Sequence, residues 1–106
     1  MNHANKPGKL SSFATVPVAK STVVQAIGPN PRRCGLSFSP PSQAGQFCYA
    51  PRPLSSLGEG FSLSQGSSPL DLRCDVHGSI VKDAWWVLNT NIADDIACVI
   101  EVSEEG

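Results

Sequence analysis

The sequence predicts an all-β domain: a small antiparallel β-sandwich or jelly roll of about seven to eight strands with an extended N-terminal arm. Short segments alternate apolar and polar residues, clusters of Pro, Gly, Ser and Asn separate them, and no stretch repeats apolar residues at helical spacing. The clearest alternation covers residues 70–77, where Leu70, Leu72, Cys74 and Val76 alternate with charged residues and His77. Because successive side chains of a strand lie on opposite faces, this segment is expected to have one buried and one exposed side.

The expected strands span residues 20–27, 34–39, 46–50, 60–64, 70–76, 84–89 and 95–102. Prolines mark several of the breaks between them, as in Gly28-Pro29-Asn30-Pro31 and Pro51-Arg52-Pro53. Proline fixes its own φ and moves the preceding residue out of the helical region, so these clusters are typical of turns. Short strands with regular turn clusters favour a sandwich or jelly roll.

We expect residues 1–19 to form the arm and residues 20–106 to form the β-sandwich domain. Leu10 is the sole sizeable apolar residue after Met1 in the first twelve positions, so this segment buries too little surface to offset the entropy of ordering it. No apolar run approaches the length of about 20 residues that a membrane-spanning helix needs. No signal peptide opens the chain, so synthesis in the cytoplasm is expected, with no membrane partner.

The net charge of −1 argues against a nucleic-acid partner, and the charges are unevenly distributed. No Asp or Glu precedes Glu59, whereas the second half carries all nine acids. One explanation is that strands from the two halves pair and bring opposite charges together; the other is that a positive arm docks on an acidic patch of a neighbouring copy. The first explanation predicts a structural ion pair between Arg33, at the start of a strand, and Glu101, in the last one.

Four cysteines raise the question of disulfides or a metal site. Cys34, Cys74 and Cys98 lie on the apolar side of their segments, where a free cysteine behaves as a small hydrophobic residue, so reduced thiols are favoured. The spacing Cys74-x-x-His77 fits a metal ligand pair, but no second pair lies near it, and residues three apart on a strand point to opposite faces. No metal and no cofactor are expected.

The sequence favours a role without catalysis. His77 could pair with Asp75 as a base and its orienting carboxylate, but no nucleophile motif accompanies them, and a histidine before Gly78 is typical of a turn. Paired carboxylates could be drawn from Asp71, Asp75, Asp83 or Asp94, and their spacing does not select a pair.

The segment Ala84-Trp85-Trp86-Val87-Leu88 is apolar on both faces of the expected strand. Adjacent residues diverge, so Trp85 and Trp86 cannot share one core, and one of them needs a second apolar environment. That environment is a covering loop or the arm, a subunit interface, or an aromatic platform of the kind that binds carbohydrate.

The order of these segments resembles that of small virion proteins of tailed phages, the capsid decoration (cement) proteins and head-fibre bases. The resemblance covers about residues 20–103. It rests on the strand closed by Asn30-Pro31-Arg32-Arg33, the aromatic strand Phe47 to Tyr49, the turn Gly60-x-x-Leu63, the pair Trp85-Trp86 and the closing strand Val99-x-Glu101.

The resemblance implies a β-sandwich that assembles as a homotrimer on the outer surface of the virion capsid, where the arm reaches across copies of the major capsid protein. The oligomer would stabilise the junctions between capsomers. The residues expected at the interfaces are Leu10, Phe13, Tyr49, Trp86 and Leu88. The alternative is a glycan-binding or fibre-base module of a virion that stacks a surface glycan on Tyr49 and Trp86.

Overall fold

The computed structural model describes residues 9–55 and 59–104, and it confirms the predicted all-β sandwich. The described residues form eight strands and two short helical segments. In chain order these are β1 (Lys9–Val18), β2 (Val23–Ile27), β3 (Arg33–Phe38), β4 (Gln46–Ala50), β5 (Phe61–Ser64), β6 (Leu70–Arg73), α1 (Cys74–His77), the 3-10 turn η2 (Gly78–Lys82), β7 (Trp85–Asn89) and β8 (Asp95–Glu104).

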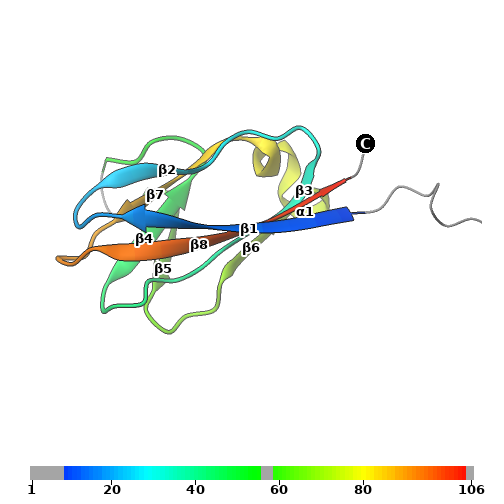
Figure 1. Ribbon diagram of the computed structural model, residues 1–106. Coiled ribbons are helices and arrows are strands. Elements are labelled where there is room, and N and C mark those ends of the chain that lie inside the picture. Colours follow the sequence, from blue (N-terminus) through cyan, green and yellow to red (C-terminus); the bar gives the residue numbers. More distant parts are fainter. Residues whose placement is uncertain (1–8, 56–58, 105–106) are drawn as a thin grey trace, which may run out of the picture.

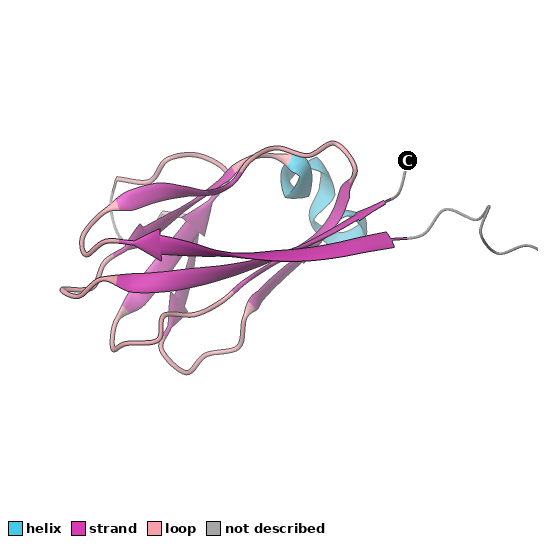
Figure 2. Ribbon diagram, viewed as in Figure 1, coloured by secondary structure: helices cyan, strands magenta, loops and turns pink. Residues whose placement is uncertain are grey.

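The strands form two four-stranded antiparallel sheets, with the order β1-β8-β3-β6 in sheet A and β2-β7-β4-β5 in sheet B. This order pairs strand 1 with 8, 2 with 7, 3 with 6 and 4 with 5, which is the order of a jelly roll. Figures 1 and 2 show the sheets stacked face to face, with the helical connection at one end. The two longest strands, β1 and β8, run side by side toward that end and reach past the other strands (Figure 1).

The main core fills the space between the sheets. Phe38 from sheet A stacks on Tyr49 from sheet B, with ring centroids 4.3 Å apart, and its ring lies 5.5 Å from that of Trp85. All three side chains are fully buried. The indole nitrogen of Trp85 donates a hydrogen bond to the Ile80 carbonyl at 2.9 Å, so the large ring is buried without an unpaired donor.

A second, smaller apolar cluster lies on the outer face of sheet B. Cys48, Ala50 and Leu88 are buried there under Leu54, and Trp86 packs against them, half-buried. The proline-containing segment that follows β4 therefore supplies the second apolar environment that strand β7 needs. Of the three environments considered for the second tryptophan, the covering segment is the one that the described residues show, and Trp86 stays partly exposed beside it.

The predicted domain boundary at residue 19 is wrong, because Lys9–Val18 is strand β1 of sheet A. It pairs with β8 along its whole length, from Lys9 opposite Glu104 to Val18 opposite Asp95. Residues 1–8 of the expected arm lie outside the described residues. The expected arm thus overlaps a strand of the sandwich.

The predicted strand over residues 70–77 is half wrong, because it ends at Arg73 and Cys74–His77 forms a single helical turn. The Arg73 amide donates to Nδ1 of His77 at 3.0 Å, which closes the turn. Gly78 follows with φ of 78°, a conformation that suits glycine. Alternating polarity alone did not distinguish this turn from a strand.

The role of Leu54 as the cover of the second cluster leads to a stability prediction. Leu54→Ala leaves a void beside Trp86 and Leu88, so the free energy of unfolding should fall by about 3 kcal/mol. Ile92→Ala is the matched control, because Ile92 is 92% exposed and loses no packing. Chemical denaturation of both variants measures the difference, and equal stabilities would contradict a sealed cluster.

Candidate interaction surface

Apolar side chains gather on the outer face of sheet A, along strands β1 and β8. In the register of these strands Phe13 lies opposite Ile100 and Pro17 opposite Ile96, with Cys98 between the two isoleucines. Cross-strand partners project from the same face of a sheet. We call this set the β1–β8 stripe: Phe13, Pro17, Ile96, Cys98 and Ile100. All five residues are exposed, and Phe13 is exposed to 78%.

Residues 10–15 of β1 are covered on neither face by the part of the chain that the structure describes. Every residue of 10–15 is exposed, including Leu10 at 56%, and only Val16 and Val18 further along are covered. Within the described residues, β8 is the one strand that pairs with β1. This half of the strand is therefore held by its backbone pairing with β8 and by a side-chain hydrogen bond between Ser12 and Glu101, not by burial of its own side chains.

The stripe is hollowed rather than flat. An open hollow of about 340 Å³ is lined by Phe13, Cys98 and Ile100 together with Ser11 and Ser12. A second hollow, of about 630 Å³, lies on the other side of Cys98, between Pro17, Ile96 and the segment that begins at Ser42. Apolar hollows next to exposed isoleucine and phenylalanine are typical of a surface that another protein covers.

The structure divides the predicted interface residues into two groups. Leu10 and Phe13 are exposed and lie on the bare half of β1. Tyr49 is wrong as an interface residue, since it is fully buried and its hydroxyl donates to the Ser39 carbonyl at 2.8 Å. Leu88 is also wrong, because it is buried in the second cluster, against which Trp86 packs.

Tyr49 and Trp86 also cannot form the predicted glycan platform. Tyr49 lies opposite Val87 and Ala50 opposite Trp86, so the two aromatic side chains project from opposite faces of sheet B. The alternating pattern of residues 95–102 did not identify Ile96, Cys98 and Ile100 as surface residues. They alternate with buried Ala97 and Val99, and the alternation does not indicate which side is buried when both sides are apolar.

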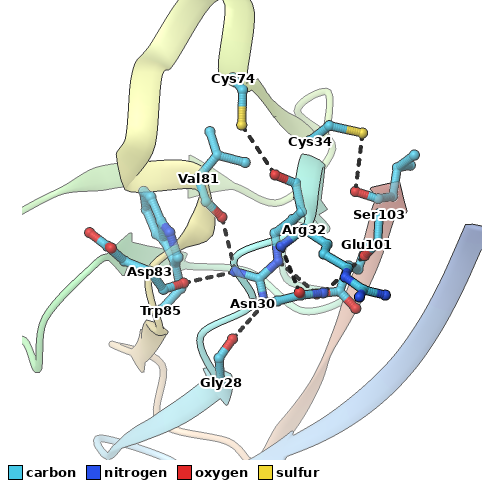
Figure 3. A network of polar contacts seen from close by, with 12 residues as sticks. Gly28, Asn30, Arg32, Cys34, Cys74, Val81, Asp83, Trp85, Glu101 and Ser103 are labelled. Atoms are coloured by element: carbon cyan, nitrogen blue, oxygen red, sulfur yellow. Dashed lines mark hydrogen bonds and ion pairs between the residues drawn. The ribbon is translucent and has the colours of Figure 1, made fainter. Parts of the chain in front are cut away.

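The predicted pair of Arg33 and Glu101 is formed, and it belongs to a larger network (Figure 3). Nε of Arg33 lies 2.7 Å from a carboxylate oxygen of Glu101. The guanidinium also donates to the carbonyls of Gly28, Val81 and Asp83. The Arg33 side chain is only 1% exposed and that of Glu101 is 18% exposed, so the guanidinium end of the pair is buried.

Two carboxyl groups have pKa values below their ordinary ones. Burial acts to raise the pKa of Glu101, but hydrogen bonds from Arg33 and Asn30, with the positive charge of Arg33, outweigh it. Burial also acts to raise the pKa of Asp95, and hydrogen bonds from Ser42, Ile96 and Gln43 outweigh it. Both groups hold loops or strand ends in place in their ionised form.

Opposite charges from the two halves of the chain do meet. They meet as charges in the pair of Arg33 and Glu101. The contact of Lys20 with Asp94 is of another kind, since the backbone amide of Lys20 donates to the Asp94 carboxylate at 2.9 Å and ties the residues after β1 to the turn before β8. The alternative, a positive arm on the acidic patch of a neighbouring copy, stays a prediction, because residues 1–8 lie outside the described part of the chain.

The residues considered for chemistry do not converge in the part of the chain that the structure describes. His77 holds the backbone of Arg73, and the Asp75 carboxylate lies 3.5 Å from Arg73 Nε. Across residues 9–55 and 59–104, no three His, Cys, Asp or Glu side chains are close enough to hold a metal ion. The thiols of Cys34 and Cys74 point to backbone carbonyls, and all four cysteines are unpaired with one another. No helix in the same ranges is long and apolar enough to span a membrane.

Comparison with known proteins gives one informative likeness. No family model and no curated protein matches the chain. A solved structure reported under the description "Bacillus endospore appendages form a novel family of disulfide-linked pili" is similar, with a TM-score of 0.55 and 11% sequence identity. The likeness covers 96% of this chain and 93% of that one, and at this identity it shows the shared fold.

The Arg33 network predicts that removing the buried charge of Arg33 lowers the stability far more than removing an exposed arginine charge. Arg33→Met leaves Glu101 without its cationic partner and removes the guanidinium donor from three carbonyls, so the free energy of unfolding should fall by about 3–5 kcal/mol. Arg52→Met is the matched control: its side chain is 64% exposed and lies 3.7 Å from Glu59, so the expected loss is below about 1 kcal/mol. Similar losses in both variants, measured by chemical denaturation, would contradict the network.

The lowered pKa values predict acid sensitivity. Glu101 and Asp95 have ordinary pKa values of 4.5 and 3.8 and lower ones in the fold, so the unfolded chain binds protons first as the pH falls. Their contribution to stability should be complete above about pH 5 and should be lost progressively below it. Denaturation at a series of pH values measures the slope, and Glu101→Gln should flatten it. An unchanged slope in that variant would assign the acid sensitivity to other groups.

Proposed function

We propose that this chain is a structural protein of a virion surface, which associates with further copies of itself and decorates the outside of a capsid. The observation that carries the proposal is the β1–β8 stripe together with the bare half of β1. A jelly roll of this size, with its main core and its second cluster both closed within one protomer, does not need to leave Phe13, Ile96 and Ile100 on one exposed face for its own stability.

The order of sequence segments supports the placement on a capsid, since it resembles that of decoration proteins and fibre bases of tailed phages. The partner would be the major capsid protein. An oligomer presents several copies of the stripe at once, so contacts that are weak individually hold it firmly through a high effective concentration. A protein attached in this way across neighbouring subunits raises the free energy needed to separate them.

A pilus subunit is the second candidate, and the observation that favours it is the likeness to the endospore appendage, which extends over nearly the whole of both chains. Both candidates are structural proteins that act through contacts between copies. They differ in what the purified chain does alone: a pilus subunit forms filaments without a capsid, whereas a decoration protein stays a small oligomer until capsids are added.

Binding to capsids tests the proposal and separates the two candidates. Purified protein should co-sediment with capsids of a tailed phage that lack their decoration, and electron microscopy of the protein alone should show no filaments. Ile96→Lys places a charge in the stripe and should lower the affinity about tenfold or more. Ile92→Lys is the matched control, since Ile92 is equally apolar, more exposed and off the stripe.

Co-sedimentation and microscopy together distinguish the decoration protein from the pilus subunit. Filaments from the purified chain would favour the pilus subunit over the decoration protein. Equal co-sedimentation of the two lysine variants would show that the stripe does not contact the capsid. Absence of co-sedimentation in the unaltered protein, together with absence of filaments, would overturn both candidates.

A further inference from the structure

Strand β1 is the outer strand of sheet A, and its free side can be assigned residue by residue. The Ser39 amide donates to the Cys98 carbonyl at 3.0 Å, and the Cys98 amide donates to Oγ of Ser39 at 2.8 Å, so the backbone groups of Cys98 face β3. Backbone groups alternate in direction along a strand, so those of Val99 face β1 and its partner there, Ala14. The groups of Phe13 and Thr15 therefore face away from the sheet.

The same alternation places the backbone groups of Ser11, Phe13, Thr15 and Pro17 on the free edge. The first three offer an N–H donor and a carbonyl acceptor each, and Pro17 offers a carbonyl alone. Proline is accepted in a sheet where its missing N–H faces no partner strand, and the position of Pro17 agrees with this assignment. Among the residues that the structure describes, no strand pairs with this ladder of donors and acceptors.

This edge lacks the features by which other edges avoid pairing. Between Lys9 and Lys20 the chain carries no charged residue. The other outer strands of the described sheets are short or irregular: β6 has four residues including Asp71 and Arg73, β5 has four residues, and β2 has five residues with a register shift after Gln25. Charges, short length and bulges all discourage a second chain from adding to an edge, and β1 has none of them over residues 10–15.

We propose that β1 pairs antiparallel with β1 of a second copy of this chain, about a two-fold axis at Phe13. In this register the two Phe13 residues lie opposite each other, and Ser11 lies opposite Thr15 of the second copy. All of these residues present backbone groups to the edge, so donors meet acceptors along the ladder. Two four-stranded sheets then join into one continuous sheet.

A second copy fits this edge better than a partner of other chemistry, because the edge is neutral and self-complementary. A neutral strand attracts neither an acidic nor a basic partner and does not repel its own copy. Antiparallel pairing at Phe13 also sends the two Lys9 residues to opposite ends, each opposite Pro17 of the other chain. The β1–β8 stripes of the two copies meet at the axis and form one apolar surface.

This inference goes beyond the proposed function, since it concerns the contact between copies and not what the joined surface covers. It predicts a dimer as the smallest oligomer, where the resemblance to phage proteins implies a trimer. The pair of β1 strands would give hydrogen-bond partners to the backbone groups on the free edge of β1.

Charge substitution at Phe13 tests the two-fold contact. Phe13 is 78% exposed, so Phe13→Glu and Phe13→Lys should fold, as circular dichroism can verify. The full unaltered chain should sediment as a dimer. In either variant alone, like charges lie opposite each other, so its dimer should dissociate about tenfold more readily. An equimolar mixture of the two variants should restore the dimer. Phe13→Leu is the neutral control and should stay dimeric.

A backbone variant tests the edge independently of the side chain. Thr15→Pro removes an N–H that faces the free edge, at a position with the same backbone direction as the native Pro17, and should weaken the dimer; Thr15→Val keeps that N–H and should not. A monomeric unaltered chain would overturn the proposal. So would a dimer or trimer that tolerates Phe13→Glu, or a mixture of the charge variants that stays monomeric.

Discussion

The buried guanidinium of Arg33 is the constraint around which one end of the jelly roll is arranged. A cation with 1% exposure needs compensation on every side, and here Glu101 of β8 and the carbonyls of Gly28, Val81 and Asp83 provide it. These acceptors come from the residue after β2, from η2, from the residues before β7 and from β8, which pairs with β3 in sheet A. One side chain therefore determines where four segments meet, and Trp85 packs against the same η2 turn.

The sequence predicts the strands of the sandwich where side-chain burial decides the structure. From β3 onward most expected strand ends lie within a residue or two of the observed ones, because alternation records which side chains the core covers. Strand β1 was not predicted, because burial of side chains does not determine its N-terminal half. Between Leu10 and Thr15 it is held by the backbone of β8, and backbone hydrogen bonds leave no pattern in the side chains.

The site residues show the same difference between contacts made by side chains, which the sequence records, and contacts made by the backbone, which it does not. The pair of Arg33 and Glu101 could be predicted, because an arginine at the start of one strand and a glutamate in another suggest a partner. The three carbonyls that complete the network could not, since any residue type supplies a carbonyl. Leu88 was misplaced because Leu54, which lies in a proline-containing segment without periodicity, covers the outer face of sheet B. Tyr49 was misplaced because its ring lies on the other face, between the sheets, where it stacks on Phe38. The apolar surface of the fold consequently lies at β1 and β8, not at β7.

The placement of Pro17 limits how far the free edge of β1 can pair. Its missing N–H lies on that edge near the end of the strand that the sandwich covers, where Val16 and Val18 are packed. Ser11, Phe13 and Thr15 keep their donors on the half that projects beyond the sandwich. A second strand therefore finds both donors and acceptors at Ser11, Phe13 and Thr15, and at Pro17, where the packed half begins, it finds a carbonyl acceptor alone. Ser11, Phe13 and Thr15 have exposed side chains within one protomer, and their outward-facing backbone donors and acceptors match those of a second copy.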